Sequence, residues 1–263
     1  MSGGPTIAGG RTGAGTDTDR TGSGFRVAVR EIREAAFRAV VAAGASSGEA
    51  ATTADLVVLG EVLDGAGVLA LADELDRVPR GRQPVSCSGG SHLVRHDPVV
   101  LHDPARRGPL LLGPSAADLA AAGPRPVLLP GVWTPSVEWI LVSAAARTGT
   151  PLLATRIRAD GSPGSCVLAT ADSTVYRAPS PGAFGTRHTA DATIRPADGI
   201  LLSRWNGDTG TPDLPPARTP AHHHERFATA MTHGLRVDPG PWATVHGAAR
   251  RYLVPERPES PQP

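Results

Sequence analysis

Three histidines in one loop-rich segment are the residues best suited to acid–base chemistry. They are His92, His96 and His102, and the last two stand in the pairs His96-Asp97 and His102-Asp103. A histidine oriented by a carboxylate can act as a general acid or base near neutral pH. Neighbours in sequence seldom orient one another, so turn-forming His-Asp-Pro segments are the simpler interpretation. We take His92, His96 and His102 as the candidate catalytic residues.

The densest group of metal-binding residue types is His222, His223, His224 and Glu225. Imidazole and carboxylate groups are common ligands of Zn²⁺. Adjacent histidines on a helix point in different directions, so one ion would need a further ligand from elsewhere in the chain. An exposed histidine run after a proline-rich loop is the favoured interpretation. We therefore expect no metal, and keep His222, His224 and Glu225 as an alternative site for a metal-dependent hydrolase.

A glycine pair at Gly65 and Gly67 begins a loose G-x-G-x-x-A pattern that ends at Ala70. Such glycines can bring a pyrophosphate close to a helix N-terminus. A dinucleotide-binding fingerprint also needs a strand before it and an acidic residue about 20 positions later. Here the preceding residues have helical spacing and no acidic residue stands at that distance. The pattern therefore favours a tight turn between two helices.

Composition excludes several classes of function. All 26 basic residues of this 263-residue chain are arginine, so no lysine is present for a Schiff base or a Walker A motif. A net charge of +1 gives no electrostatic reason to expect nucleic acid or an anionic membrane as a partner. The two cysteines, Cys87 and Cys166, form no metal-binding spacing. No apolar signal or membrane-spanning run occurs, and we expect a cytoplasmic protein.

The first part of the chain has the spacing of a three-helix unit. Apolar residues recur at helical intervals over 29–43, Ser46 and Glu49 form a capping box for a second helix, and a third helix follows Gly67. Residues 1–24 and 256–263 are rich in glycine, proline and polar residues, so we expect both ends to be disordered. The predicted units are therefore a helical unit over 25–81 and a mixed α/β body over 82–255.

The body contains short apolar runs bounded by glycine and proline. Residues 109–113, 125–130 and 151–158 have the character of buried strands, and Pro135 begins a strong helix over 135–148. Strand, helix and strand over 125–158 predict a βαβ unit with a parallel pair. A last helix is expected to begin at Pro241. The fold class predicted from these elements is α/β, with a mixed sheet and at least one βαβ unit.

Three stretches of hydrophobic pattern resemble an uncharacterised bacterial family, a domain of unknown function. The first runs from Arg30-Glu31-Ile32 to Leu75, the second from Leu110 to Pro130, and the third from Trp242 to Glu256. Where that family ends in a Ser-Arg and glycine-rich segment, this chain has Arg257-Pro-Glu-Ser-Pro. The resemblance brings no activity with it.

A more distant similarity is to the malate/L-lactate dehydrogenase-like family. In that family an Ala-Leu-Val helix leads to Ser-His-Gly-Val and then Arg-Leu, where this chain has Gly65-Ala66-Gly67-Val68 and Ala70-Leu71. The resemblance implies a non-Rossmann NAD(P)-binding fold and a homodimer. It places the family's catalytic histidine on Ala66 and its substrate-binding arginine on Ala70. A later Asn-His-Phe-Gly segment of the family falls near Trp133-Thr134-Pro135, where the histidine is also missing.

These observations lead to one main functional expectation and two alternatives. The main one is a small-molecule-binding protein or pseudoenzyme of a bacterial biosynthetic pathway that keeps a dehydrogenase-like fold. The first alternative is an NAD(P)-dependent oxidoreductase that uses His92, His96 or His102 as its acid. The second is the metal-dependent hydrolase on the His222 cluster. In the main interpretation the cofactor is unknown, and NAD(P) is the alternative.

Overall fold

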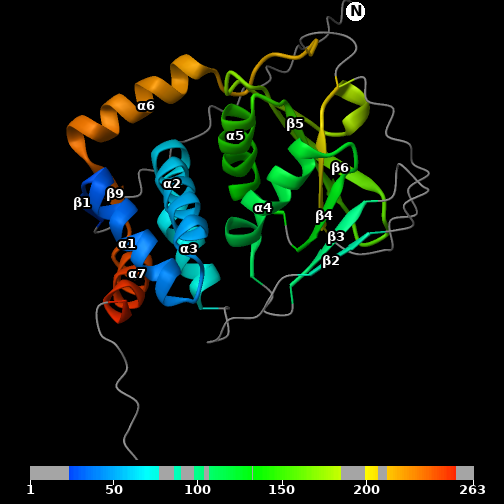
Figure 1. The fold of residues 1–263 in the computed structure, drawn as a ribbon. Coiled ribbons are helices and arrows are strands. Elements are labelled where there is room, and N and C mark those ends of the chain that lie inside the picture. Colours follow the sequence, from blue (N-terminus) through cyan, green and yellow to red (C-terminus); the bar gives the residue numbers. More distant parts are fainter. Residues whose placement is uncertain are drawn as a thin grey trace, which may run out of the picture.

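Two sets of helices and a mixed sheet form successive layers in this computed structural model (Figure 1). The structure describes residues 24–76, 86–89, 98–103, 107–131, 133–184, 199–206 and 212–252. His92 and His96 lie outside these ranges, as do nearly all residues of the two predicted disordered ends, so those predictions remain as they were. None of the helices in the described ranges is both long and apolar enough to cross a membrane.

The outer layer combines helices from both ends of the chain. Its members are α1 (Val29–Ala42), α2 (Ser47–Asp64), α3 (Gly67–Leu75) and α7 (Pro239–Arg251). The predicted capping box is present, because Ser46 Oγ accepts the amide of Glu49 at 3.3 Å and the Glu49 carboxylate accepts the amide of Ser46 at 2.8 Å. The last helix begins two residues before the predicted Pro241, and it packs against α1 and α3.

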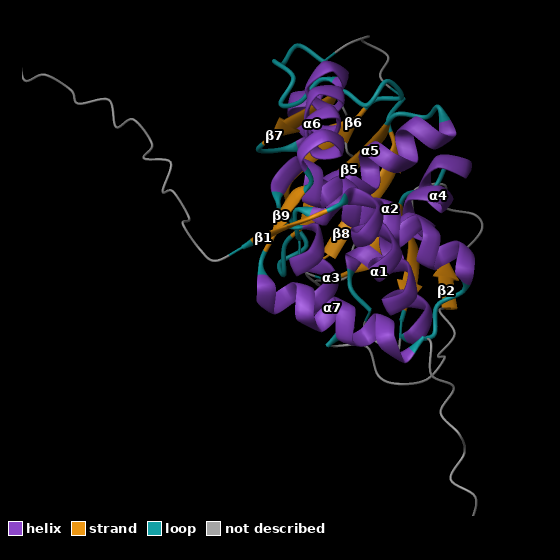
Figure 2. Ribbon diagram, turned by 90° about the vertical axis from the view of Figure 1, so that its left-hand side faces the viewer, coloured by secondary structure: helices purple, strands orange, loops and turns teal. Residues whose placement is uncertain are grey.

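A two-stranded ribbon and a further helix join this layer. Strand β1 (Phe25–Val27) pairs antiparallel with β9 (Leu235–Val237), which directly precedes α7. Helix α6 (Pro220–His233) extends from the sheet side of the molecule toward this ribbon (Figure 1). Figure 2 shows the helices in front of the sheet, with α1 and α7 at the base of the outer layer. The predicted helical unit over 25–81 is thus completed by residues from the far end of the chain.

The main sheet has the order β2-β3-β4-β8-β5-β6-β7 within the described residues. Its strands are β2 (Ser86–Gly89), β3 (Val99–His102), β4 (Val127–Pro130), β5 (Leu152–Ile157), β6 (Pro163–Ala169), β7 (Val175–Ala178) and β8 (Gly199–Arg204). A short 3-10 turn, η1 (Pro181–Phe184), follows β7. Strands β3 and β4 are parallel, whereas every other neighbouring pair is antiparallel. The mixed sheet expected from the sequence is therefore present.

The strand predicted over 109–113 is wrong, because these residues begin a helix. Helix α4 (Pro109–Ala122) has Gly108 as its N-cap residue, and Pro109 stands at its first position. Periodicity alone cannot separate a short apolar run in a strand from one in a buried helix, and the flanking glycine and proline were interpreted as strand ends. The alanine-rich residues that follow, with Ser115 among them, continue the same helix.

The βαβ prediction over 125–158 is half correct. Helix α5 (Ser136–Thr148) connects β4 to β5, as expected. The two strands run in the same direction but are not neighbours, because β8 lies between them and pairs antiparallel with both. A parallel pair of adjacent strands with a connecting helix does occur one step earlier, in β3, α4 and β4. The sequence pattern does not predict this β3-α4-β4 unit, because the apolar run that begins α4 has the character of a strand.

Helices α4 and α5 form the middle layer, and two glycines allow neighbouring helices to pack closely. A Cβ atom on Gly60 of α2 would lie 2.4 Å from the Trp139 ring, and one on Gly113 of α4 would lie 2.3 Å from Ile140. Trp139 and Ile140 are both buried. The first contact brings α2 against α5, and the second packs the two helices of the middle layer against each other.

Candidate functional site

A cavity of about 640 Å³ lies where α3 faces the starts of α4 and α5. Its floor is formed at the carboxyl ends of the parallel strands β3 and β4, through Leu101 and Leu129. In α/β sheets, ligands bind preferentially at this end of parallel strands, and ligand pockets typically have volumes of about 300–1,000 Å³. The position and size of this cavity make it the candidate functional site.

One face of α3 forms a wall of the cavity. Ala66, Leu69, Ala70 and Asp73 follow one another at helical spacing and all line it. The first three are apolar, and Leu69 is 50% exposed although it is a large hydrophobic residue. The two positions where the dehydrogenase resemblance puts a histidine and an arginine thus face the cavity as alanines. The first ionisable group on this face is the exposed carboxylate of Asp73.

The turn that begins α3 depends on both glycines of the G-x-G-x-x-A pattern. Gly65 ends α2 in the left-handed region with φ +63°, and a Cβ atom on Gly67 would lie 1.9 Å from the carbonyl oxygen of Val57. The segment is therefore a tight interhelical turn, as the sequence favoured. The buried carboxylate of Glu61 accepts the amide of Val68 at 2.9 Å. It occupies the helix N-terminus where a phosphate would otherwise bind.

Burial raises the pKa of the Glu61 carboxyl, and the amides of Val68 and Gly67 oppose this rise by hydrogen bonding to the charged form. A carboxyl with a raised folded-state pKa binds more protons folded than unfolded. Its contribution to the free energy of unfolding is therefore greatest at low pH and decreases as pH rises through the ordinary pKa of 4.5 toward the folded value.

Glu61→Gln should remove this decrease in the free energy of unfolding, because glutamine does not titrate. The structure should be retained, because the glutamine carbonyl can still accept the Val68 amide. We expect the stability of the variant relative to the natural chain to increase as pH rises from the ordinary pKa of 4.5 to the raised pKa of Glu61. Urea unfolding at several pH values measures it. Glu225→Gln removes a carboxylate at an exposed position on α6 and is the matched control. A relative stability of Glu61→Gln that decreases with pH would contradict the assignment.

A carboxylate also occupies the N-terminus of α4, and it belongs to Glu74. Its two carboxylate oxygens accept the amides of Leu110 at 2.7 Å and Leu111 at 3.1 Å. A Cβ atom on Gly108 would lie 2.4 Å from this carboxylate, so the glycine leaves the space that Glu74 needs. Negative charge at a helix N-terminus is favourable. Two of the three helices that start at the cavity, α3 and α4, therefore carry internal carboxylates at their N-termini.

The guanidinium group that lines the cavity belongs to Arg107, and it is paired with Asp103. Arg107 Nη2 lies 2.9 Å from Asp103 Oδ1, and Arg107 Nε donates to the same carboxylate at 3.3 Å. The Asp103 side chain is only 5% exposed. A substrate carboxylate would have to compete with this bidentate, largely buried pair for the arginine.

A network of charges lies behind Trp139, on the far side of the cavity wall. The indole of Trp139 donates to Asp64 at 2.6 Å, and Asp64 also pairs with Arg218 at 2.5 Å. Arg218 lies 3.2 Å from Glu138, which pairs in turn with Arg177. These contacts connect the end of α2, the start of α5 and the segment before α6. Their role is to fix the wall of the cavity.

His102, the one predicted catalytic histidine within the described residues, does not line this cavity. His102 lies on β3 between Leu101 and Asp103, which both line the cavity. Successive side chains of a strand point to opposite faces, so His102 points away, where its Nε2 meets the hydroxyl of Ser88 on β2. His92 and His96 lie outside the described residues, and their catalytic role stays a prediction.

The His222 cluster lies on α6, away from the cavity. His222, His224 and Glu225 are exposed, whereas His223 is buried. Burial lowers the pKa of His223, and nearby Arg218 and His222 lower it further. Among the residues that the structure describes, no three His, Cys, Asp or Glu side chains gather closely enough to hold a metal ion.

The two cysteines and the two arginines of the β5 region, Arg156 and Arg158, do not line the cavity. Cys166 is buried in β6, where burial raises the pKa of its thiol to about 11, so it is a poor nucleophile at neutral pH. Cys87 is exposed on β2. Arg158 bonds locally to Ser162 and Pro163, and Arg156 is exposed on β5.

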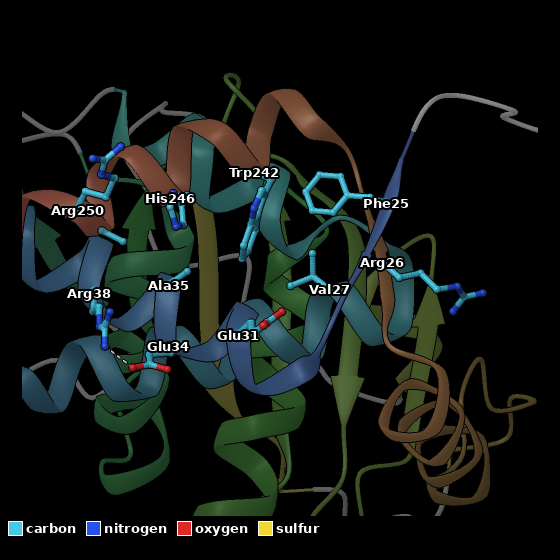
Figure 3. A pocket seen from close by; sticks show the side chains of 11 residues that line it. Phe25, Arg26, Val27, Glu31, Glu34, Ala35, Arg38, Trp242, His246 and Arg250 are labelled. Carbon is cyan, nitrogen blue, oxygen red and sulfur yellow. Dashed lines mark hydrogen bonds and ion pairs between the residues drawn. The ribbon is translucent and has the colours of Figure 1, made fainter.

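A second, more open pocket of about 380 Å³ lies between β1, α1 and α7 (Figure 3). Phe25 meets Trp242 edge-on at 6.4 Å, and Trp242 lies 6.0 Å from His246 between ring centres. Glu34 and Arg38 form an ion pair along α1, drawn as a dashed line. These contacts secure α7 to the ribbon and to α1.

Sequence reasoning missed the residues that control the cavity. The sequence could have indicated Asp73, because it stands one helical turn after Ala70 and so on the same face of the helix. Asp103 and Arg107 are four residues apart, but the spacing indicates a pair only once their backbone is known. Glu74 and Leu110 are separated by 36 residues, and no local pattern connects them.

Comparison with known proteins identifies the fold. No family model and no curated protein sequence matches the chain, so the resemblance to the uncharacterised family finds no support. Solved structures do match. Malate dehydrogenase from Entamoeba histolytica is 10% identical, with a TM-score of 0.57 over 88% of this chain and 99% of its own.

Two further structures give the same result. Malate dehydrogenase from Pyrococcus horikoshii has a TM-score of 0.56 at 10% identity, over 88% of this chain and 97% of its own. Sulfolactate dehydrogenase from Methanocaldococcus jannaschii has a TM-score of 0.55 at 10% identity, over 88% of this chain and 98% of its own. The distant similarity noted in the sequence is confirmed at the level of fold. The chain has a mixed α/β, dehydrogenase-like fold.

Proposed function

We propose that this chain is a small-molecule-binding protein, built on a non-Rossmann dehydrogenase-like fold, that has lost hydride transfer. One observation carries the proposal. Ala66 and Ala70, the positions where the resemblance expects the catalytic histidine and the substrate-binding arginine, both line the cavity. An alanine can neither donate a proton to a developing alkoxide nor hold a substrate carboxylate. The cavity itself is retained, which supports binding without this chemistry.

The described residues around the cavity do not fit the pyrophosphate of NAD(P). A pyrophosphate binds to free amides at a helix N-terminus. At α3 the carboxylate of Glu61 accepts such an amide, and at α4 the carboxylate of Glu74 accepts two. At α5 the amides of Val137 and Glu138 donate to the carbonyl oxygens of Thr134 and Pro135. A bound pyrophosphate would have to displace these buried carboxylates or lie against them. The proposal therefore assigns no dinucleotide to this cavity.

Titration of the purified full-length protein with NADPH tests this point directly. We expect no saturable change in NADPH fluorescence up to about 1 mM, which would correspond to less than about 4 kcal/mol of binding free energy. A malate dehydrogenase titrated in the same buffer is the positive control. Saturable binding in the micromolar range would contradict the proposal and favour the NAD(P)-dependent oxidoreductase. Cytoplasmic location, the homodimer and a biosynthetic pathway remain predictions.

A further inference from the structure

We propose that the cavity between α3, α4 and α5 binds a small ligand with an apolar body and one ammonium group, which Asp73 receives. The inference rests on the proposed function, because it names the chemical class of ligand for the same cavity. It follows from three features of the described lining. These are its apolar walls, the sign of its net charge, and the partners that each charged group already has.

The walls favour an apolar body. Leu101, Leu112 and Leu129 line the cavity from β3, α4 and β4, and Ala66 and Ala70 line it from α3. Leu69 adds a half-exposed apolar side chain on the same face of α3. Burial of apolar ligand surface against such walls contributes about 25 cal/mol for each Å² removed from water. Binding strength would therefore come from the body of the ligand, and selectivity from its charge.

The charges favour a cation. The ionisable groups among the described lining residues are the carboxylates of Asp73, Glu74 and Asp103 and the guanidinium of Arg107, with a formal charge of −2. Arg107 already holds Asp103 bidentately. Against these described groups, a ligand carboxylate or phosphate would meet a surplus of negative charge, whereas an ammonium group would reduce it.

Asp73 is the lining carboxylate that is available to a ligand. Glu74 is committed to the amides of Leu110 and Leu111, and Asp103 to Arg107. Asp73 is exposed and forms no ion pair or hydrogen bond with another described residue. It stands one turn beyond Ala70 on the cavity face of α3. An ammonium group that enters along the alanine face would therefore reach a hydrated carboxylate without breaking an existing contact.

Three probes with the same phenyl body test the proposal on the full-length protein at low salt. Phenethylamine is the cation, hydrocinnamate the anion and phenethyl alcohol the neutral reference. Calorimetric titration and saturation-transfer NMR measure their dissociation constants. We expect phenethylamine to bind about tenfold more tightly than hydrocinnamate. The partly exposed Asp73 carboxylate attracts the ammonium group and repels the hydrocinnamate carboxylate by a similar energy.

Variants of α3 assign the effect to Asp73. Asp73→Asn should weaken phenethylamine binding about fivefold and leave phenethyl alcohol unchanged. Asp76→Asn is the matched control, because Asp76 is an exposed aspartate at the end of the same helix and does not line the cavity. Ala70→Trp should fill the cavity and abolish binding of all three probes. Leu69→Trp, at a half-exposed position, serves the same purpose if Ala70→Trp fails to fold.

Each other outcome overturns a distinct claim. Hydrocinnamate binding as tightly as phenethylamine, and lost in Ala70→Trp, would refute the cation preference and leave the small-molecule site in place. An equal loss of affinity in Asp73→Asn and Asp76→Asn would refute the assignment to Asp73. No binding of any probe would refute both this inference and the proposed function of the cavity.

Discussion

Purified full-length protein should oxidise malate or lactate with NAD⁺ or NADP⁺ no faster than the background rate, even at high protein concentration. Hydride transfer from a 2-hydroxy acid needs a group that exchanges the hydroxyl proton and a cation that holds the carboxylate. Ala66 and Ala70 supply neither, and Arg107 is held by Asp103. Loss of a general acid or base alone costs about 10²–10⁴-fold in rate. Absence of the cation should bring the rate to background.

The measurement is absorbance of the reduced cofactor, with a malate dehydrogenase as positive control and a melting curve to show that the protein is folded. Robust oxidation that is lost in His96→Ala or His102→Ala would contradict the proposal. It would show that the segment containing these histidines reaches the substrate, and would favour the oxidoreductase. Robust oxidation that persists in both variants would contradict the proposal and also exclude the predicted acids.

Gly67→Ala should destabilise the fold by about 3 kcal/mol or more. The added Cβ atom would lie 1.9 Å from the carbonyl oxygen of Val57 and 2.7 Å from the amide nitrogen of Glu61. Both are backbone atoms of α2, so no side chain can turn aside, and α2 and α3 must separate. The same displacement would pull Val68 away from the Glu61 carboxylate. Urea unfolding followed by circular dichroism measures the loss.

Gly247→Ala is the matched control for this substitution. Gly247 lies inside α7, and a Cβ atom there would meet nothing within 4 Å. Alanine is favoured over glycine inside a helix, so this variant should gain about 0.5–1 kcal/mol. If the two variants had the same stability, the close contact between α2 and α3 would be wrong. A loss in Gly67→Ala alone assigns the effect to the crossing of the two helices.

Much of the fold could be predicted where its cause is local. Ser46 and Glu49 cap a helix through contacts three residues apart, and Gly65 begins the tight turn between α2 and α3. These features depend only on neighbouring residues, so the sequence pattern indicated them correctly. Helix α4 could not be assigned in this way. Its start is stabilised by Glu74, which is distant in the chain, and its apolar run is equally compatible with a buried strand.

The candidate site was less predictable than the fold for the same reason. The sequence directed attention to histidines, yet the cavity is controlled by carboxylates whose partners are set by tertiary structure. His102 and Asp103 are adjacent in sequence but point to opposite faces of β3. The alanines at 66 and 70 became informative only through a family resemblance, because an alanine has no chemistry that a pattern could reveal.

The central position of β8 has a consequence for how the chain folds. Strands β4 and β5 are both made before β8, and each has its inner edge open until β8 inserts between them. Open strand edges expose unpaired amides and carbonyls that can pair with other chains. The sheet thus closes only after residue 204 has been synthesised. Until then the growing chain has two unpaired strand edges, one on β4 and one on β5. Protection by chaperones against aggregation matters most during that interval.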